Sequence, residues 1–295
     1  MSPNQATAIA LLAAVAWGSG NVAQKTILQN LDGWQATAIT SLIGAVVLLP
    51  LVRREGRGPL PQAQGSGPLL FAVSALFTFA STVMQFGYGL TSVANAGFLV
   101  NTSAVLTPIL GWVFLAHRVP LAIWPASLAT LFGIFLMAGA NWAGLSSGDI
   151  LSLASAAGFA MWTLAVGAYA MRYHRPALLT CVQLAVCGGV CALASLWFSS
   201  PPTWGALLAA LPEILMIGVV SKGLAYVLMA IAQQHLAAST VAILVSAEAV
   251  FGALFAAIVL GESLDAVRSM GALFIILSVA VAARVPALPA KQAKA

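Results

Sequence analysis

Residues 211–260 read LPEILMIGVVSKGLAYVLMAIAQQHLAASTVAILVSAEAVFGALFAAIVL and consist of two apolar segments joined by a short polar turn around Gln233, Gln234 and His235. Each segment has the roughly 20 residues that a helix needs to cross a bilayer. Each also carries one ionisable residue near its middle, Lys222 in the first and Glu248 in the second. A lone charge at the centre of a membrane helix costs about 3 kcal/mol on insertion scales, so such residues face a partner, a bundle interior or a water-filled cavity. We therefore expect each charge to be a candidate partner of the other, and function to lie close to them.

The composition is that of a membrane protein. Charged residues make up 6% of the chain and hydrophobic residues 61%, with a mean hydropathy of +1.00, whereas soluble domains carry about 25% charged residues. The net charge of +5 comes from basic residues that occur singly or in small loop clusters, and these form no basic face for nucleic acid. We expect the lipid bilayer as a partner and no nucleic acid.

Apolar runs of the length that spans a bilayer recur along the whole chain. Ten can be drawn, at residues 6–28, 35–52, 68–90, 93–116, 121–141, 149–171, 177–198, 211–233, 238–260 and 266–284. The sequence thus predicts an all-α polytopic membrane protein with ten transmembrane helices.

The chain also repeats itself. A shift of 145 residues places Trp17 on Trp162, and a shift of 144 places residues 99–118 on residues 243–262. We divide the chain into a first five-helix repeat, 1–144, a second, 145–284, and a cytoplasmic tail, 285–295. Because five crossings are an odd number, the second repeat enters the membrane inverted relative to the first. Inverted repeats around a site near the midplane are a recurring plan of secondary transporters, so we expect a central cavity and alternating access.

The distribution of lysine and arginine predicts the orientation. With the N-terminus inside, the inner loops and the tail hold nearly all loop lysines and arginines, and the outer side holds only Lys25 and Arg268. We therefore place both termini in the cytoplasm and the multi-pass chain in the inner, cytoplasmic membrane. Lys25 is expected to snorkel from the outer end of its span. The first apolar segment is too long for a cleaved signal peptide and is interpreted as a span.

Three groups of motifs carry a family resemblance. The first span contains Trp17-Gly18-Ser19-Gly20-Asn21, Tyr226 leads to Leu236-Ala237-Ala238-Ser239, and Glu248 is followed by Leu260-Gly261-Glu262. With the two-times-five layout, these motifs resemble the EamA-type family of the drug/metabolite transporter superfamily over nearly the whole chain, from about Ala6 to Ala283. The resemblance implies export of small metabolites, amino acids included, from the cytoplasm.

Two positions depart from that family pattern. Ala249 stands where a proline often follows the acid of the ninth span, and His117-Arg118 stands where Gly-Glu is usual. The departures leave the subfamily and the substrate open.

Polar side chains follow one face of several predicted spans, at the steps of three and four residues that mark one side of a helix. Such a face in a membrane should contact protein or water. Trp17 and Trp162 lie near mid-span, and their large rings suit an apolar or aromatic ligand. The candidate substrate-binding residues are Trp17, Asn21, Thr78, Thr82, Gln85, Tyr88, Asn101, Trp162, Lys222, Tyr226, Ser246 and Glu248.

The central charges and tryptophans each have two interpretations. Lys222 and Glu248 either form an ion pair that lets two helices cross the membrane, or bind the ends of a zwitterion, with proton uptake by Glu248 as a further possibility. Trp17 and Trp162 either line the cavity or pack between helices. The sequence leaves both pairs of interpretations open.

Two helix-breaking residues occupy matching places in the repeats. Pro108 in the fourth span and Gly252 in the ninth are hinge candidates, since such residues are tolerated where neighbours satisfy the freed backbone groups. Gly252 also suits plain close packing, because Glu248, Gly252 and Ala256 are four residues apart.

An enzyme is the main alternative from another class. The sequence has no HExxH motif and no nucleophile elbow, and no histidine lies within a predicted span, so we expect no catalytic residue, no metal site and no cofactor. A receptor is a further alternative, although it has no need of inverted repeats. Exchange of nucleotide sugars or phosphorylated metabolites also stays open, but such anions want several cations and only Lys222 is central. A small solute, with aromatic and other neutral amino acids as the leading class, fits better.

The cysteines give no sign of a redox or metal motif. Cys181, Cys187 and Cys191 lie in one apolar segment, at spacings that match neither, so we interpret them as buried small hydrophobic residues. The sequence indicates no oligomeric state, and a monomer is compatible with it.

Overall fold

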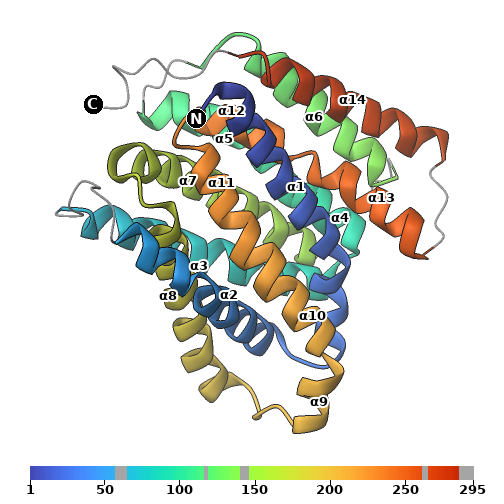
Figure 1. The fold of residues 1–295 in the computed structure, drawn as a ribbon. Coiled ribbons are helices and arrows are strands. Elements are labelled where there is room, and N and C mark those ends of the chain that lie inside the picture. Colours follow the sequence, from blue (N-terminus) through green and yellow to red (C-terminus); the bar gives the residue numbers. More distant parts are fainter. Residues whose placement is uncertain (57–64, 116–118, 140–145, 261–264, 286–295) are drawn as a thin grey trace.

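Helices account for the regular structure of the chain. The computed structural model describes residues 1–56, 65–115, 119–139, 146–260 and 265–285, and within these ranges every regular element is a helix (Figure 1). In this described part, eight helical segments are long and apolar enough to cross a membrane, and two shorter apolar helices accompany them. The all-α polytopic fold expected from the sequence is confirmed. His117, Arg118, Gly261, Glu262 and the tail after residue 285 lie outside the described residues.

The elements follow the predicted spans closely. The first half contains α1 (Pro3–Thr26), the short 3-10 helix η1 (Ile27–Gln29), α2 (Gly33–Glu55), α3 (Gly67–Leu90), α4 (Val93–Asn101), α5 (Ser103–Leu115) and α6 (Ile123–Met137). The second half contains α7 (Ser147–Tyr173), α8 (Pro176–Phe198), α9 (Trp204–Ala209), α10 (Leu211–Leu215), the π-helix η2 (Met216–Ala225), α11 (Tyr226–Ala232), α12 (Ala238–Val245), α13 (Glu248–Leu260) and α14 (Ala266–Ala282). The eighth span is thus α10, η2 and α11 in succession.

Polar caps determine where three spans begin. In each cap the N-cap side chain and the third helical residue bond each other's backbone N–H groups, which satisfies two otherwise unpaired donors. The capping boxes are Ser2 with Gln5 for α1, Asp32 with Gln35 for α2, and Ser146 with Asp149 for α7. These helices begin two or three residues before the expected starts at 6, 35 and 149, because the polar first turn belongs to the helix although it is not apolar.

The fourth and ninth spans are both broken, at positions that the repeat relates. Thr102 separates α4 from α5, and its hydroxyl donates to the Leu99 carbonyl at 2.6 Å. Ser246, 144 residues later, follows α12, and its hydroxyl donates to the Ile243 carbonyl at the same 2.6 Å. A hydroxyl that bonds back to the preceding turn competes with the helix ladder and bends the helix. The two repeats therefore interrupt equivalent spans by the same local interaction.

The hinge candidates lie six residues beyond these breaks. Pro108 is inside α5 and Gly252 is inside α13. Proline at 108 cannot bond the Ala104 carbonyl, which accepts instead from the Ser127 hydroxyl of α6 at 3.5 Å. An ideal Cβ on Gly18 would lie 2.8 Å from the Gly252 backbone nitrogen, so Gly252 takes part in close packing of α13 on α1. A hinge role for either residue stays a prediction.

The packing of the helices is symmetric between the two halves. α2 packs on α8 and α6 on α14, so the second and fifth spans each contact their own counterparts. In the first half α3 packs on α7, and its counterparts in the second half, η2 and α11, pack on α1. In the same way, α5 packs on α7 and its counterpart α13 packs on α1. In Figure 1 α2, α3 and α8 form one side of the molecule, and α6, α13 and α14 form the other. Exchange of the halves leaves this pattern unchanged, as two inverted five-helix repeats require.

Candidate functional site

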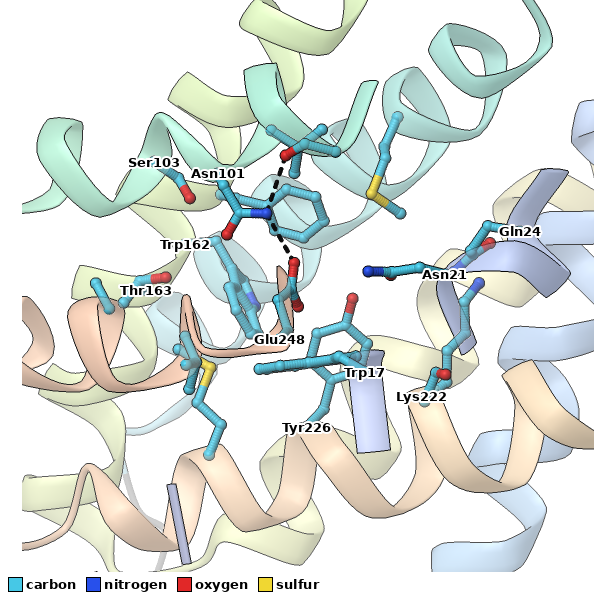
Figure 2. A pocket seen from close by; sticks show the side chains of 18 of the residues that line it. Trp17, Asn21, Gln24, Asn101, Ser103, Trp162, Thr163, Lys222, Tyr226 and Glu248 are labelled. Carbon is cyan, nitrogen blue, oxygen red and sulfur yellow. Dashed lines mark hydrogen bonds between the residues drawn. The ribbon is translucent and has the colours of Figure 1, made fainter. Parts of the chain in front are cut away.

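A cavity of about 100 Å³ lies between the two halves, where the broken spans face α1 and η2 (Figure 2). One water molecule needs roughly 10–15 Å³ of such space, so the cavity has room for several waters or a small solute group. From the sequence-predicted set it brings together Trp17, Asn21, Tyr88, Asn101, Trp162, Lys222, Tyr226 and Glu248. The remaining lining residues are Gln24, Met84, Gly97, Val100, Ser103, Phe159, Thr163, Ser221, Met229, Ala242 and Val245.

Tyr226 is the centre of an aromatic cluster on one wall of this cavity. Its ring centroid lies 5.0 Å from that of Trp17, 5.3 Å from that of Trp162 and 5.0 Å from that of Phe77, each in an edge-to-face arrangement. Such T-shaped pairs are favourable because the positive ring edge meets the negative ring face. Trp17 and Trp162, which the repeat relates, therefore meet on the same tyrosine.

Glu248 is held at the junction of the broken spans. It is the first residue of α13, where the helix dipole favours a negative side chain. The carboxamide of Asn101, the last residue of α4, donates to Glu248 Oε1 at 2.9 Å and also to the Gly97 carbonyl at 2.9 Å (Figure 2). The carboxylate thus has one identified partner from the other repeat and borders the cavity.

Lys222 lies in η2, and the residue is only 3% exposed. Its ammonium donates to the Ser41 hydroxyl of α2 at 2.8 Å, with the Thr37 carbonyl at 3.5 Å. Among the described residues, one ion pair has its nitrogen and oxygen within 4.0 Å, and it joins Arg268 to Asp265. Lys222 and Glu248 therefore do not form an ion pair with each other. The expectation that each would be the other's partner is wrong in this structure. The cause is that the Ser41 hydroxyl offers Lys222 an acceptor on a span remote in sequence.

Two of the predicted substrate-binding residues, Thr78 and Ser246, donate their hydroxyl hydrogen bonds to carbonyls of the preceding helical turn. The Thr78 hydroxyl donates to the Ser74 carbonyl at 2.7 Å, and Ser246 bonds back to Ile243 as described above. Neither lines the cavity. Their roles in solute binding stay predictions.

Two further predicted residues join helices just beside the cavity. The Gln85 amide of α3 donates to the Gln24 carbonyl of α1 at 3.0 Å. The Thr82 hydroxyl lies 3.2 Å from the sulfur of Cys191 on α8. Neither Gln85 nor Thr82 lines the cavity, so binding roles for them also stay predictions.

Among the additional lining residues, some carry a signal in the sequence and some do not. Gln24 and Met229 lie on the same helical faces as Asn21 and Tyr226, and Ser103 belongs to the polar patch that begins at Asn101. Small apolar lining residues such as Gly97 and Ala242 resemble the rest of any membrane helix. No pattern in one sequence singles them out.

A network beside the cavity joins the ends of α1, α3 and α7. The Lys25 ammonium donates to the Tyr88 carbonyl at 2.6 Å and to the Thr91 carbonyl at 3.0 Å, at the C-terminal end of α3. Thr91 in turn donates from its hydroxyl to Asp149 Oδ1 at 2.8 Å. The last carbonyls of a helix have no partners in the helix and attract a cation, which accounts for the position of the Lys25 ammonium; its expected snorkelling stays a prediction.

Within the described ranges, no group of three or more histidine, cysteine or acidic side chains is arranged to hold an ion. At the turn between α11 and α12, burial lowers the pKa of His235, and the positive charges of the N-terminus and His174 act in the same direction.

Comparison with known proteins follows the same two-part plan. The EamA-like transporter family matches the chain twice, over residues 5–139 and 146–284. A protein of Archaeoglobus fulgidus named "Uncharacterized transporter" is 24% identical over 278 residues, which are 92% of this chain and 83% of that protein. A solved crystal structure is similar with a TM-score of 0.79 at 18% identity, covering 95% of this chain and 97% of the other; that likeness shows the fold alone.

Proposed function

The chain belongs to the EamA-like transporter family, and from that membership we propose that it exports small zwitterionic solutes by alternating access. Aromatic and other neutral amino acids are the proposed substrates. Family membership makes the chain a multi-pass membrane transporter. The chemistry of the cavity residues is the basis for proposing a zwitterionic solute. We also propose the inner membrane as its location, with both termini in the cytoplasm, from the lysine and arginine bias of the loops.

The observation that carries the proposal is the separation of the two central charges. Lys222 and Glu248 both border one cavity, yet each is held by a neutral partner, Ser41 and Asn101 respectively. Figure 2 shows Glu248 and Lys222 on either side of Tyr226. A zwitterionic solute between them would give each of the two charges an opposite charge. The carboxylate would face Lys222 and the ammonium would face Glu248.

The aromatic cluster supports an apolar or aromatic solute side chain. Trp17, Tyr226 and Trp162 present rings to the same cavity. Aromatic rings contribute large apolar contact area and prefer to meet other rings edge to face. A phenylalanine-like side chain fits this wall, whereas a strongly polar side chain would lose its hydration without gaining equivalent partners.

The paired breaks support alternating access. Discontinuous spans at matching places of two inverted repeats characterise transporters in which one bundle rocks against another around a midplane site. Thr102 and Ser246 provide such breaks, and the site lies between them. We propose residues 1–144 and 145–284 as the two repeats. In the transport step, the cavity between them would close on one side of the membrane and open on the other.

The competing functions fit the cavity less well. Nucleotide sugars and phosphorylated metabolites carry two or more negative charges, and Lys222 is the one cation among the described lining residues. An enzyme would need a nucleophile with a base or a metal, and the lining set brings no such combination together in the described part of the chain. Solute transport without covalent chemistry is the function that we propose.

Purified protein in liposomes tests this proposal. Vesicles loaded with labelled phenylalanine, leucine, glutamate or a nucleotide sugar are diluted, and efflux is followed with and without a pH gradient. We expect saturable efflux of phenylalanine and leucine above that of empty liposomes and of liposomes with Lys222→Met. Efflux of the nucleotide sugar in place of the neutral amino acids would contradict the proposed substrate class.

A further inference from the structure

Two of the three cysteines form a pair on one face of α8. Cys187 and Cys191 are one helical turn apart, where side chains lie about 5–6 Å from each other at Cβ. Both are free and fully buried. The spacing in the sequence matches no known motif, but the fold makes the pair a dithiol.

The surroundings of this dithiol are polar and lead to the cavity. The Ser41 hydroxyl donates to Cys187 Sγ at 3.7 Å and accepts from the Lys222 ammonium at 2.8 Å. On the other side, the Thr82 hydroxyl lies 3.2 Å from Cys191 Sγ. A continuous series of contacts therefore runs from a cavity-lining cation through a hydroxyl to the sulfur of Cys187, and the sulfur of Cys191 has a hydroxyl of its own beside it.

The third cysteine has a different environment. Cys181 donates from its thiol to the Ala45 carbonyl at 3.4 Å, which is an ordinary contact between α8 and α2. It is also free and buried. Cys181 therefore serves as a matched control for a thiol in the same helix without the neighbouring thiol and the link to Lys222.

We propose that Cys187 and Cys191 form a second binding site, for a soft thiophilic ligand that bridges two sulfurs, with a trivalent arsenical as its probe. Phenylarsine oxide would react with both thiols without any change of oxidation state. Two arsenic–sulfur bonds form, the arsenic–oxygen bond breaks, and the oxygen leaves as water with the two thiol protons. The nearby Lys222 ammonium would offset negative charge on sulfur while the protons leave, as a cation does at reactive cysteines.

Occupation of this site would also act on the transport cavity. A bridged arsenic atom takes the place of the contact between Ser41 and Cys187, and Ser41 is the side chain that holds the Lys222 ammonium. The ligand would therefore displace Lys222 and stop transport. This second effect rests on the proposed function, whereas binding of the arsenical does not.

The binding test uses purified full-length protein and phenylarsine oxide, followed by excess mercaptoethanol, with intact mass as the readout. We expect one bridged arsenical per chain in the wild type and in Cys181→Ala, released by the dithiol 2,3-dimercaptopropanol. Cys187→Ser and Cys191→Ser keep hydroxyls for the local hydrogen bonds, and each should retain no arsenical after mercaptoethanol. Wild type without a retained arsenical, or serine variants that retain as much as wild type, would overturn the proposal.

Transport in liposomes then tests the link to the cavity. The arsenical should abolish phenylalanine efflux by wild type and Cys181→Ala and leave that of Cys187→Ser unchanged. Full efflux by arsenical-loaded wild type would overturn the link. If untreated wild type moves no amino acid, the proposed function fails while the mass measurement still decides the dithiol site.

Discussion

Asn101 donates a hydrogen bond of 2.9 Å from Nδ2 to Oε1 of Glu248 and thereby joins the end of α4 to the start of α13. Both residues stand at the breaks of their spans, one in each repeat. The bond joins the two interrupted spans at the cavity and fixes the position of the carboxylate there.

Loss of this bond should affect both stability and transport. Asn101→Ala removes the identified partner of a carboxylate, and hydrogen bonds to charged groups contribute about 1.5–3 kcal/mol. We expect the free energy of unfolding to fall by about that amount and phenylalanine efflux to fall with it, measured by denaturation in detergent and by liposome efflux. As a control, Ser278→Ala removes a buried hydroxyl whose one hydrogen bond among the described residues is to the Phe274 carbonyl within α14, so efflux should not change. Equal behaviour of the two variants would contradict the special role of Asn101.

Close approach of the fifth and tenth spans gives a steric prediction. An ideal Cβ on Gly133 would lie 2.7 Å from the Gly271 carbonyl oxygen, which is backbone and cannot rotate away. Gly133→Ala should therefore destabilise the protein by about 1–3 kcal/mol through overpacking. Gly189→Ala is the matched control, because nothing lies within 4 Å of its ideal Cβ and alanine favours a helix over glycine by about 0.5–1 kcal/mol. Thermal unfolding in detergent should move in opposite directions for the two variants; a stable Gly133→Ala would argue against the α6–α14 interface.

The aromatic cluster predicts a change in solute preference. Trp17→Leu removes an edge-to-face contact with Tyr226 and part of the cavity wall, and such contacts contribute about 0.5–1.5 kcal/mol. We expect efflux of phenylalanine relative to leucine to fall by roughly 2- to 13-fold, which corresponds to that energy range at about 1.4 kcal/mol for each factor of ten. Trp34→Leu alters a ring that packs on Phe86 and lies outside the cavity, so it should keep the wild-type ratio. An unchanged ratio in Trp17→Leu would mean that the ring only packs helices.

Lys25 should hold one side of the cavity closed. Its ammonium joins α1 to the final carbonyls of α3, and Lys25→Met removes both bonds. In a background with alanine at all three cysteines and Asn21→Cys as the reporter, a membrane-impermeant maleimide added outside should label Lys25→Met faster than the parent. The same labelling rate in both proteins would show that Lys25 does not close this side.

Much of the fold could be predicted because hydropathy and helix length are local properties. All ten segments form helices within a few residues of the expected bounds. The breaks at Thr102 and Ser246 could not be predicted, since a hydroxyl that ends a helix and one that lines a polar face look alike in sequence. Pro108 and Gly252 gave stronger local signals, yet both lie inside helices.

The site could be predicted in its residue types more than in its contacts. The central charges, the paired tryptophans and Tyr226 stand out because such residues are unusual in mid-span, and the cavity brings them together. Their partners depend on tertiary packing. Opposite charge suggested that Lys222 pairs with Glu248, but the fold places Ser41 of α2 beside the ammonium, and nothing near Ser41 in the sequence indicates that contact.

The central claim is that Lys222 and Glu248 bind opposite ends of a zwitterion. Binding of labelled phenylalanine to purified wild type, Lys222→Met and Glu248→Gln, in competition with phenylalaninamide and N-acetylphenylalanine, tests it most directly. The amide lacks the carboxylate and the acetyl compound lacks the ammonium, so wild type should bind both at least ~10-fold more weakly than phenylalanine, about 1.4 kcal/mol. Lys222→Met should lose discrimination against the amide alone, and Glu248→Gln against the acetyl compound alone. Folded variants that keep the wild-type affinity and order of competitors would contradict the claim.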